Sequence, residues 1–291
     1  MTSPAETPSS ATFLAFAQRG RNSWWRYVLG MVLGLVFGVV LAVAVLTPLT
    51  MLHWLPPNFG TLMLHPSEPV TFFLANGAMF GVIAIGYYGA IALLHHKRFT
   101  DLLGAWHWRG YAAGFGIWIA ALSVIALIDF TLAPKAFSFT GSSHTPAVLG
   151  AALAGLAVQT FTEELVFRGY LTQGLLLATR NPLAASVISG LLFGSIHIPN
   201  GLPQAVNAVA FGVVMSLIAI RTGGLAFGCG LHLANNLFGA VAVVSASDVF
   251  KGSPGLFTQN APHLMWWDLV ITTIGLGLMA ILAFRARRGG V

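Results

Sequence analysis

Residues 147–171 read AVLGAALAGLAVQTFTEELVFRGYL, an apolar run that carries Glu163, Glu164 and Arg168 toward its end. The first half of this run is typical of a membrane-spanning helix. One ionised side chain at the centre of such a helix costs about 2.5 to 3.5 kcal/mol on translocon scales, so three of them need partners or a water-filled cavity. The run therefore predicts a membrane helix that contains a functional polar site.

The composition of the whole chain is that of an integral membrane protein. Hydrophobic residues make up 56% of the chain, charged residues 8%, and the mean hydropathy is +0.80, whereas a soluble domain has roughly 25% charged residues. The net charge of +6 does not indicate nucleic-acid binding, because the basic residues are spread between apolar segments. Cys229 is the single cysteine, so no disulfide can form within the chain. We expect it to be a packing residue.

The spacing of apolar segments predicts an all-α, polytopic membrane protein with about eight transmembrane helices. A helix needs about 20 apolar residues to cross the hydrocarbon core. The chain offers candidates at 27–49, 70–94, 110–132, 148–172, 183–199, 203–220, 223–245 and 265–284. We expect a loose cytoplasmic tail at 1–24 and transmembrane helices 1–3 at 25–146. A transmembrane core follows at 147–245, and a loop, the last transmembrane helix and a basic tail at 246–291.

The positions of lysine and arginine predict the orientation, because cytoplasmic loops carry the excess of positive charge. With the N-terminus inside, eleven basic residues fall on the cytoplasmic side, and Lys135 and Lys251 fall outside. The eleven are Arg19, Arg21, Arg26, Lys97, Arg98, Arg109, Arg180, Arg221, Arg285, Arg287 and Arg288. We therefore expect both termini in the cytoplasm.

Helix geometry predicts how the three charges of the opening run are arranged. At about 100° per residue, Glu164 and Arg168 lie about 40° apart on one face, whereas Glu163 and Arg168 differ by about 140°. Arg168 is therefore the expected partner of Glu164. That pairing leaves Glu163 to face a cavity.

Two histidines within the predicted spans supply further polar groups. In GLHLANNLFG, residues 230–239, His232 and Asn236 share a helix face and Asn235 turns aside. In LLFGSIHIPNG, residues 191–201, Phe193 lies one turn before His197. We expect both segments to converge with the glutamate pair at a similar depth in the membrane.

A carboxylate, two imidazoles and a carboxamide in a wet membrane cavity match the needs of hydrolysis. Glu163 would take a proton from water that an imidazole helps to hold. His232 and the Asn236 amide would then stabilise the oxyanion of a tetrahedral intermediate.

Three motifs in this chain resemble those of the CPBP intramembrane proteases, a family that includes the type II CAAX prenyl endopeptidases. EELVFR at 163–168, FGSIH at 193–197 and HLANN at 232–236 look like EExxxR, FxxxH and HxxxN, in the expected order on separate helices. The resemblance covers roughly 147–245 and implies a CAAX-type intramembrane endopeptidase. The roles that it implies are water activation by Glu163 with His197, an oxyanion site at His232 and Asn236, and support from Glu164, Arg168 and Phe193.

The resemblance also indicates the setting and the partners. The family includes bacterial proteins linked with bacteriocin processing and self-immunity, so we expect a bacterial inner-membrane protein. Residues 147–245 would be its catalytic core, surrounded by the lipid bilayer. The substrate would be a membrane-associated peptide or protein, prenylated or not, and no nucleic-acid partner is expected.

Metal use is left open by the residues. Glu163, His197 and His232 would make a His₂Glu set, as in catalytic zinc sites, and zinc or another divalent metal is therefore an alternative. Against this, the sequence has no HExxH, in which two ligands one turn apart accompany a base. We favour water activated by glutamate without a metal or other cofactor.

Two further function classes fit the same polar residues. A non-catalytic immunity or scaffolding protein would keep the pocket for binding alone. A proton-coupled transporter would use intramembrane Glu, His and Arg as a proton relay, although no inverted repeat with broken helices is evident. Asp129 and Asp268 are expected to be interfacial. Gln204 and Asn207 could line the cavity, but we expect them to form hydrogen bonds between helices.

Overall fold

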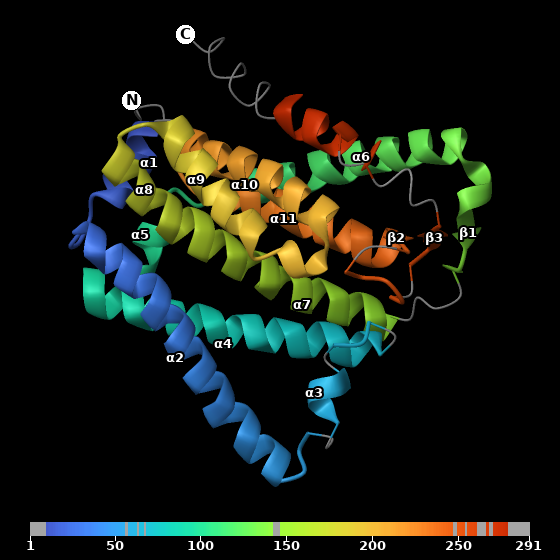
Figure 1. Ribbon diagram of the computed structural model, residues 1–291, viewed down its shortest axis with the longest axis horizontal. Helices are drawn as coiled ribbons and strands as arrows, with labels where there is room; N and C mark the ends of the chain where they lie inside the picture. Colours follow the sequence, from blue (N-terminus) through green and yellow to red (C-terminus); the bar gives the residue numbers. More distant parts are fainter. Residues whose placement is uncertain are drawn as a thin grey trace, which may run out of the picture.

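The structure, a computed structural model, is dominated by helices (Figure 1). It describes residues 10–55, 58–62, 64–66, 68–141, 146–246, 249–253, 255–260, 266–267 and 270–278. The α-helices are α1 (Ser10–Ala17), α2 (Trp24–Met51), α3 (Phe59–Leu62), α4 (Pro69–His95), α5 (Phe99–Leu103), α6 (Trp108–Leu132), α7 (Pro146–Glu164), α8 (Gln173–Thr179), α9 (Pro182–Ser195), α10 (Leu202–Thr222) and α11 (Ala226–Leu237). Residues 270–278 are also helical.

Stretches of π-helix and short 3₁₀ helices interrupt this regular pattern among the described residues. The π-helices are η3 (Leu165–Thr172), which joins α7 to α8, and η5 (Phe238–Ala242), which continues α11. The 3₁₀ helices are η1 (Pro134–Ala136) and η4 (Ile198–Asn200). Because π-helix is rare and occurs often at functional sites, the position of η3 directly after the glutamate pair draws attention to that region.

A small sheet, which the sequence did not predict, lies at the end of the bundle where α6 ends and α7 begins (Figure 1). Its strands are β1 (Phe137–Phe139), β2 (Val243–Ser245) and β3 (Phe257–Gln259), in the order β1-β3-β2. β1 pairs antiparallel with β3, and β2 pairs parallel with β3. The sheet ties the segment after α6 to the segment after α11.

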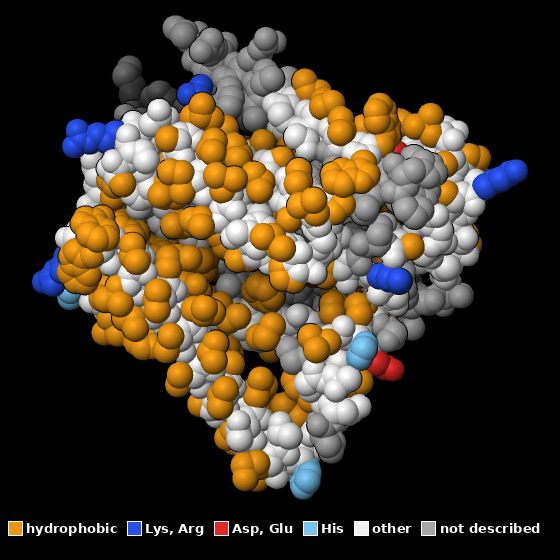
Figure 2. Space-filling view, viewed as in Figure 1, with side chains coloured by type: hydrophobic (Ala, Val, Ile, Leu, Met, Phe, Trp, Pro, Cys, Tyr) orange, Lys and Arg blue, Asp and Glu red, His pale blue; other side chains and the backbone are white. Residues whose placement is uncertain are grey.

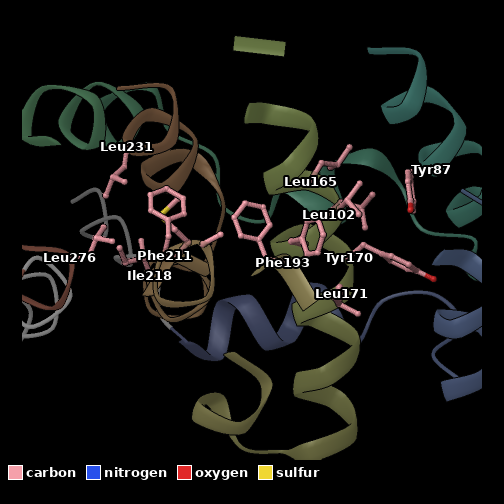
Figure 3. Packing of buried hydrophobic residues seen from close by; sticks show 14 of the residues in the cluster. Tyr87, Leu102, Leu165, Tyr170, Leu171, Phe193, Phe211, Ile218, Leu231 and Leu276 are labelled. Carbon is pink, nitrogen blue, oxygen red and sulfur yellow. The ribbon is translucent and has the colours of Figure 1, made fainter. Parts of the chain in front are cut away.

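The helix α7 lies at the centre of the bundle, with α4 along one side and α11 along another (Figure 1). In turn, α2 packs on α4, α6 packs on α11, and α9 packs on α10. Figure 3 shows the core between these helices, where Phe193 of α9 lies between residues of η3, such as Tyr170, and Phe211 of α10. The core therefore joins the three segments that carry the sequence motifs.

Two glycines allow α4 and α7 to approach closely. A Cβ atom at Gly155 would collide with the backbone carbonyl oxygen of Phe73, and one at Gly77 would lie 2.6 Å from the Cα of Gly155. Small residues at helix interfaces permit this backbone contact in membrane proteins. The two helices are thus held at a distance that no larger residue would permit.

Four helices of the described residues are long and apolar enough to cross a membrane, namely α2, α4, α6 and α10. The expected count of about eight spans is therefore not confirmed. The span predicted at 148–172 is divided between α7 and η3, and the last one, 265–284, falls partly outside the described residues. Large apolar side chains cover much of the outer surface (Figure 2). A surface of this kind is typical of a protein in contact with lipid.

The N-terminal segment is more ordered than the sequence led us to expect. Residues 10–17 of the predicted loose tail form α1, and Phe13 is fully buried in a cluster with Leu176 and Leu225. The sequence reasoning failed here because an eight-residue apolar helix is too short to be recognised as a membrane span. Residues 1–9 and residues 279–291, which include the end of the last predicted span and the expected basic C-terminal tail, lie outside the described residues.

A buried lysine anchors the end of α1. Lys97 Nζ donates hydrogen bonds to the carbonyl oxygens of Ala17 at 2.7 Å and Phe16 at 3.4 Å, and to Gln173 Oε1 at 3.2 Å. Burial removes water from its ammonium group and lowers the pKa of Lys97 to about 8, although the nearby Asp101 carboxylate acts in the opposite direction. Because Gln173 begins α8, this contact connects α1 to the continuation of α7.

The second half of this anchor is an ion pair. Arg19 Nη1 donates to Asp101 Oδ1 at 2.8 Å, and the Arg98 backbone N–H donates to Asp101 Oδ2 at 2.9 Å. Burial alone would raise the pKa of Asp101, but these hydrogen bonds and the positive charges of Arg19 and Lys97 lower it below its ordinary value.

Three further expectations from the sequence concern Asp129, Cys229 and Asp268. Asp129 lies in the last turn of α6 and is buried, with 4% of its surface exposed, so its expected place at the membrane interface stays a prediction. Cys229 is buried in an apolar cluster, which confirms the packing role. Asp268 lies outside the described residues.

Candidate active site

The charged pair of the opening run forms as helix geometry predicts. Arg168 Nη1 donates to Glu164 Oε1 at 2.9 Å, and both side chains are almost completely buried. The guanidinium also lies over the Phe193 ring, with 4.4 Å between Cζ and the ring centroid, a cation–π contact. Arg168 Nε and Nη2 have no hydrogen-bond partner among the described residues. The pairing of Glu164 with Arg168 is confirmed.

His232 of α11 lies between the two glutamates. Its Nδ1 is 2.8 Å from Glu164 Oε1, and its Nε2 is 3.5 Å from Glu163 Oε2. Because the Glu164 carboxylate is paired with Arg168, it acts as an acceptor, so His232 Nδ1 carries a proton and donates it. The other ring nitrogen, Nε2, is therefore the one that faces Glu163.

Glu163 lines a cavity of about 480 Å³, as the sequence predicts. Its carboxylate accepts a long hydrogen bond from Gln159 Nε2 at 3.4 Å, one turn earlier on α7. His232 lines the same cavity. The neighbouring glutamates thus have different surroundings, because Glu164 is paired with arginine and Glu163 is in contact with a space large enough for water and a ligand.

His197 reaches this cavity from just beyond the end of α9, not from within a span as expected. The helix ends at Ser195, and His197 Nδ1 is 2.8 Å from the carbonyl oxygen of Phe193. A carbonyl can only accept, so Nδ1–H donates and Nε2 carries the lone pair. Both His197 and Glu163 line the cavity without a hydrogen bond between them.

Phe193 explains why an aromatic residue belongs to the second motif. Its ring centroid is 4.6 Å from that of His197 and 6.2 Å from that of His232, and the ring also supports the Arg168 guanidinium. One side chain therefore contacts residues from all three motifs. The supporting role expected of Phe193 has a clear geometric basis.

Asn236 also lines the cavity, and so does Asn235, which was wrongly expected to turn aside. Trp118 Nε1 donates to Asn235 Oδ1 at 3.1 Å, and Asn235 Nδ2 donates to Asn236 Oδ1 at 3.2 Å. This chain of hydrogen bonds fixes the Asn236 carboxamide by its oxygen, and among the described residues its N–H donors have no partner and are left for a ligand. Sequence reasoning missed Trp118 because it lies on α6, far from the motifs.

The rest of the cavity wall is made of carboxamides and phenylalanines. Besides Asn235 and Asn236, the carboxamides are Asn76, Gln159, Asn200, Gln204 and Asn207. The phenylalanines are Phe72, Phe73, Phe193, Phe211, Phe238 and Phe250. Gln204 and Asn207 thus line the cavity, which was the alternative to a role in hydrogen bonding between helices. Sequence periodicity could not reveal which face of α10 meets the cavity.

The side chains proposed as metal ligands do not fit a metal ion in this arrangement. In the part of the chain that the structure describes, no three His, Cys, Asp or Glu side chains lie close enough to hold one ion. His232 Nδ1 is bonded to Glu164 and His197 Nδ1 to a backbone carbonyl, which leaves both Nε2 atoms available, so the distances between the side chains, and not these hydrogen bonds, decide against a shared ion. The alternative of a zinc ion held by Glu163, His197 and His232 has no support from this geometry.

Comparisons with known proteins agree with the class that the fold and the site define. Residues 145–238, which include all three motifs, match the family model described as type II CAAX prenyl endopeptidase Rce1-like. The resemblance seen in the motifs is thus confirmed for this segment of a helical membrane protein. The Bacillus subtilis (strain 168) protein YyaK, described as uncharacterized, is 28% identical over 260 residues, which cover 85% of this chain and 87% of YyaK.

Proposed function

We propose that this protein is an intramembrane endopeptidase that hydrolyses a peptide bond of a membrane-associated peptide or protein. One observation carries the proposal. Glu164 is paired with Arg168 and His232, which leaves Glu163 beside a cavity that His197 and Asn236 also line. The match of this segment to a type II CAAX prenyl endopeptidase family supports the same activity.

In the first step, Glu163 acts as the general base. A water molecule held between its carboxylate and His197 Nε2 gives a proton to Glu163, and the water oxygen attacks the carbonyl carbon of the scissile peptide bond. The electron pair of the carbonyl double bond moves to the oxygen. The result is a tetrahedral intermediate with a negatively charged oxygen.

In the second step, the oxyanion is stabilised and the intermediate collapses. The protonated His232 imidazole, held by Glu164, and the Asn236 amide donate hydrogen bonds to the oxyanion. The carbonyl forms again as the C–N bond breaks, and the proton on Glu163 moves to the leaving nitrogen. The products are a carboxylic acid and an amine, so water is the only co-reactant.

The proposal includes a location and an orientation in the cell. The protein lies in a bacterial inner membrane with both termini in the cytoplasm, because eleven lysines and arginines fall on one side of the predicted spans and two on the other. Attachment of a reactive maleimide to single cysteines placed at Arg98 and at Lys251, in a Cys229→Ser background, tests this orientation in intact cells.

The test of the activity is the Glu163→Gln variant, which replaces one oxygen by nitrogen and removes the base. New N-termini in membrane peptides are compared by mass spectrometry between cells that express the wild-type and the variant protein. We expect rates of specific cleavage to fall by about 10² to 10⁴ while detergent-solubilised variant keeps the thermal stability of the wild type. Undiminished cleavage would remove Glu163 from the mechanism.

The other function classes predict different results from the same pair of proteins. A binding or immunity protein would keep its cellular phenotype after Glu163→Ala. A proton-coupled transporter would move a solute into liposomes without producing new peptide termini.

A further inference from the structure

The fully buried Trp118 of α6 is the first member of a chain of hydrogen bonds that ends at the cavity. Its indole Nε1–H donates to Asn235 Oδ1 at 3.1 Å. An indole nitrogen can donate a hydrogen bond but cannot accept one. The atom of Asn235 that faces Trp118 must therefore be the carbonyl oxygen, and this requirement fixes the orientation of the Asn235 carboxamide.

The orientation of Asn235 in turn determines that of Asn236. Because Trp118 holds the Asn235 oxygen, the Asn235 NH₂ group is the end that faces Asn236, and its Nδ2 donates to Asn236 Oδ1 at 3.2 Å. Asn236 therefore accepts with its oxygen, and its own NH₂ group is the end left over. Asn236 lines the cavity together with His232, and its NH₂ group has no partner among the described residues.

The direction of this chain matters for an oxyanion. A carboxamide without fixed partners can present either its oxygen or its nitrogen, because the two ends have nearly the same shape. An oxygen turned toward a developing negative charge would repel it, whereas an N–H donor stabilises it. Reversal of Asn236 alone would set its NH₂ group against that of Asn235, and reversal of both amides would set the Asn235 NH₂ group against the Trp118 N–H. The indole thus opposes both reversals.

Packing between α6 and α11 holds the indole in place independently of its hydrogen bond. The two helices lie along one another, and glycines allow their backbones to touch. A Cβ atom at Gly114 would collide with the carbonyl oxygen of Phe227, and one at Gly230 would collide with that of Tyr111. Trp118 also belongs to the main buried apolar cluster. The first donor of the chain therefore has a fixed position relative to the helix that carries the two asparagines.

We propose that Trp118 is a positioning residue of the reaction: through Asn235 it turns the Asn236 amide so that an N–H donor, and not the oxygen, meets the oxyanion. Trp118 is not among the residues that line the cavity, so it acts without touching the substrate. The inference rests on the proposed endopeptidase function and deepens it. It adds a residue that lies outside the segment 145–238 matched by the family model.

Steady-state kinetics of the full-length protein in lipid nanodiscs test the inference, on a peptide that the wild type cleaves and Glu163→Gln does not. Trp118→Phe keeps an aromatic ring and removes the indole N–H. We expect kcat to fall about tenfold and KM to stay within about twofold of wild type, because the oxyanion exists in the transition state and not in the bound substrate. Trp106→Phe is the matched control, since Trp106 packs on Tyr111 and Phe161 and is not among the lining residues. Its kcat and KM should both stay within about twofold of wild type.

A double-mutant cycle shows whether Trp118 acts through Asn236. Asn236→Ala removes the last donor of the chain, and kcat should fall about 10²-fold. Addition of Trp118→Phe to Asn236→Ala should lower kcat by less than about twofold further, because no donor remains to be oriented. Asn235→Leu breaks the chain in its middle and should show the same loss of about tenfold and the same non-additivity with Asn236→Ala. This variant covers the case in which Trp118→Phe does not fold.

A phosphinic peptide with the sequence of the cleaved peptide gives a readout that a merely structural role of Trp118 would not change. Its tetrahedral phosphorus carries a charged oxygen, as the intermediate does, whereas the carbonyl of the substrate is planar and neutral. The inhibition constant of this compound should rise about tenfold in Trp118→Phe, in parallel with the loss in kcat/KM.

Three results would overturn the inference and leave the proposed function intact. The first is a kcat within about twofold of wild type in both Trp118→Phe and Asn235→Leu. The second is a loss in the double variant equal to the product of the single losses, which would mean that Trp118 acts by another route than Asn236. The third is an unchanged inhibition constant for the phosphinic peptide. If no peptide shows cleavage that depends on Glu163, the proposed function fails and the inference fails with it.

Discussion

Two buried charge clusters of this protein use their polar atoms in different ways. The first cluster, made of Lys97, Asp101 and Arg19, is the α1 anchor. Its Lys97 ammonium group has three acceptors, and Asp101 accepts from the Arg19 side chain and from a backbone N–H. In the motif cluster, made of Glu163, Glu164, Arg168 and His232, part of the guanidinium lacks a hydrogen-bond partner among the described residues.

The difference indicates what each cluster does. The polar contacts of the α1 anchor are made with other groups of the protein, so this cluster holds α1 in place. The motif cluster instead directs one carboxylate and one imidazole nitrogen to a cavity. Incomplete pairing beside a cavity is expected where a ligand or a reaction completes the contacts.

The largest effect is expected from Arg168→Met. Removal of the guanidinium leaves the Glu164 carboxylate buried without its cation, which should lower the free energy of unfolding by about 3 to 5 kcal/mol. Chemical unfolding in detergent micelles measures this loss. The double variant Arg168→Met with Glu164→Leu leaves no unpaired charge at this pair and should recover most of the stability. If the single variant loses less than about 1 kcal/mol, the ion pair is not structurally important.

The next largest effect is expected in catalysis, from Glu164→Gln. The amide can still accept a hydrogen bond from His232, but it no longer stabilises a protonated imidazole, so kcat should fall about 10²-fold. Steady-state kinetics in nanodiscs on a peptide found by terminal sequencing measure the change. Asp101→Asn in the α1 anchor is the control and should stay within about twofold of wild type. Equal losses in both variants would remove the distinction between the clusters.

The pH dependence of stability separates the clusters further. The pKa of Lys97 is about 8 in the folded protein and near 10.5 when the chain is unfolded. Between these values the unfolded state binds more protons, so the free energy of unfolding rises as pH increases from about 8 to 10.5. We expect a gain of about 1 to 2 kcal/mol after allowance for solvent screening.

Unfolding curves at a series of pH values measure this gain. The Lys97→Met variant should lose the slope, and Lys135→Met, at an exposed lysine, should keep it. A slope that persists in Lys97→Met would assign it to another group.

The smallest effect is expected from Arg19→Gln. Its side chain is 54% exposed although Asp101 is buried, and exposed ion pairs contribute about 1 kcal/mol or less. The same unfolding measurement as for Arg168→Met provides a direct comparison. A loss above about 2 kcal/mol would mean that the α1 anchor depends on this ion pair more than its exposure indicates.

Local spacing predicted the parts of the site that depend on one helix. The Glu164–Arg168 pair forms because residues i and i+4 share a face. Glu163 lies about 140° away from Arg168 around the helix and so faces the cavity instead. Asn235 could not be predicted from spacing, since its position depends on Trp118 of another helix. Likewise, His197 follows the end of α9, and the sequence pattern does not mark that end.

The parts of the fold that were missed depend on contacts between distant segments. The strands β1, β2 and β3 have three residues each, too few for an alternating pattern to be recognised. The helix α1 is stabilised by burial of Phe13 and by Lys97 from beyond α4. The π-helix η3 contains no residue that would distinguish it from an α-helix in the sequence.

The contact between Gly77 and Gly155 has a consequence for the ligands that this protein can accommodate. Gly155 lines the cavity together with Phe72 and Phe73 of the facing helix α4. Because Gly155 has no Cβ, α4 can pack closely on α7, which sets the distance between these two phenylalanines and Glu163. An alanine at position 155 would push α4 outward and enlarge the chamber. The residue at position 155 thus limits how bulky a ligand the cavity admits.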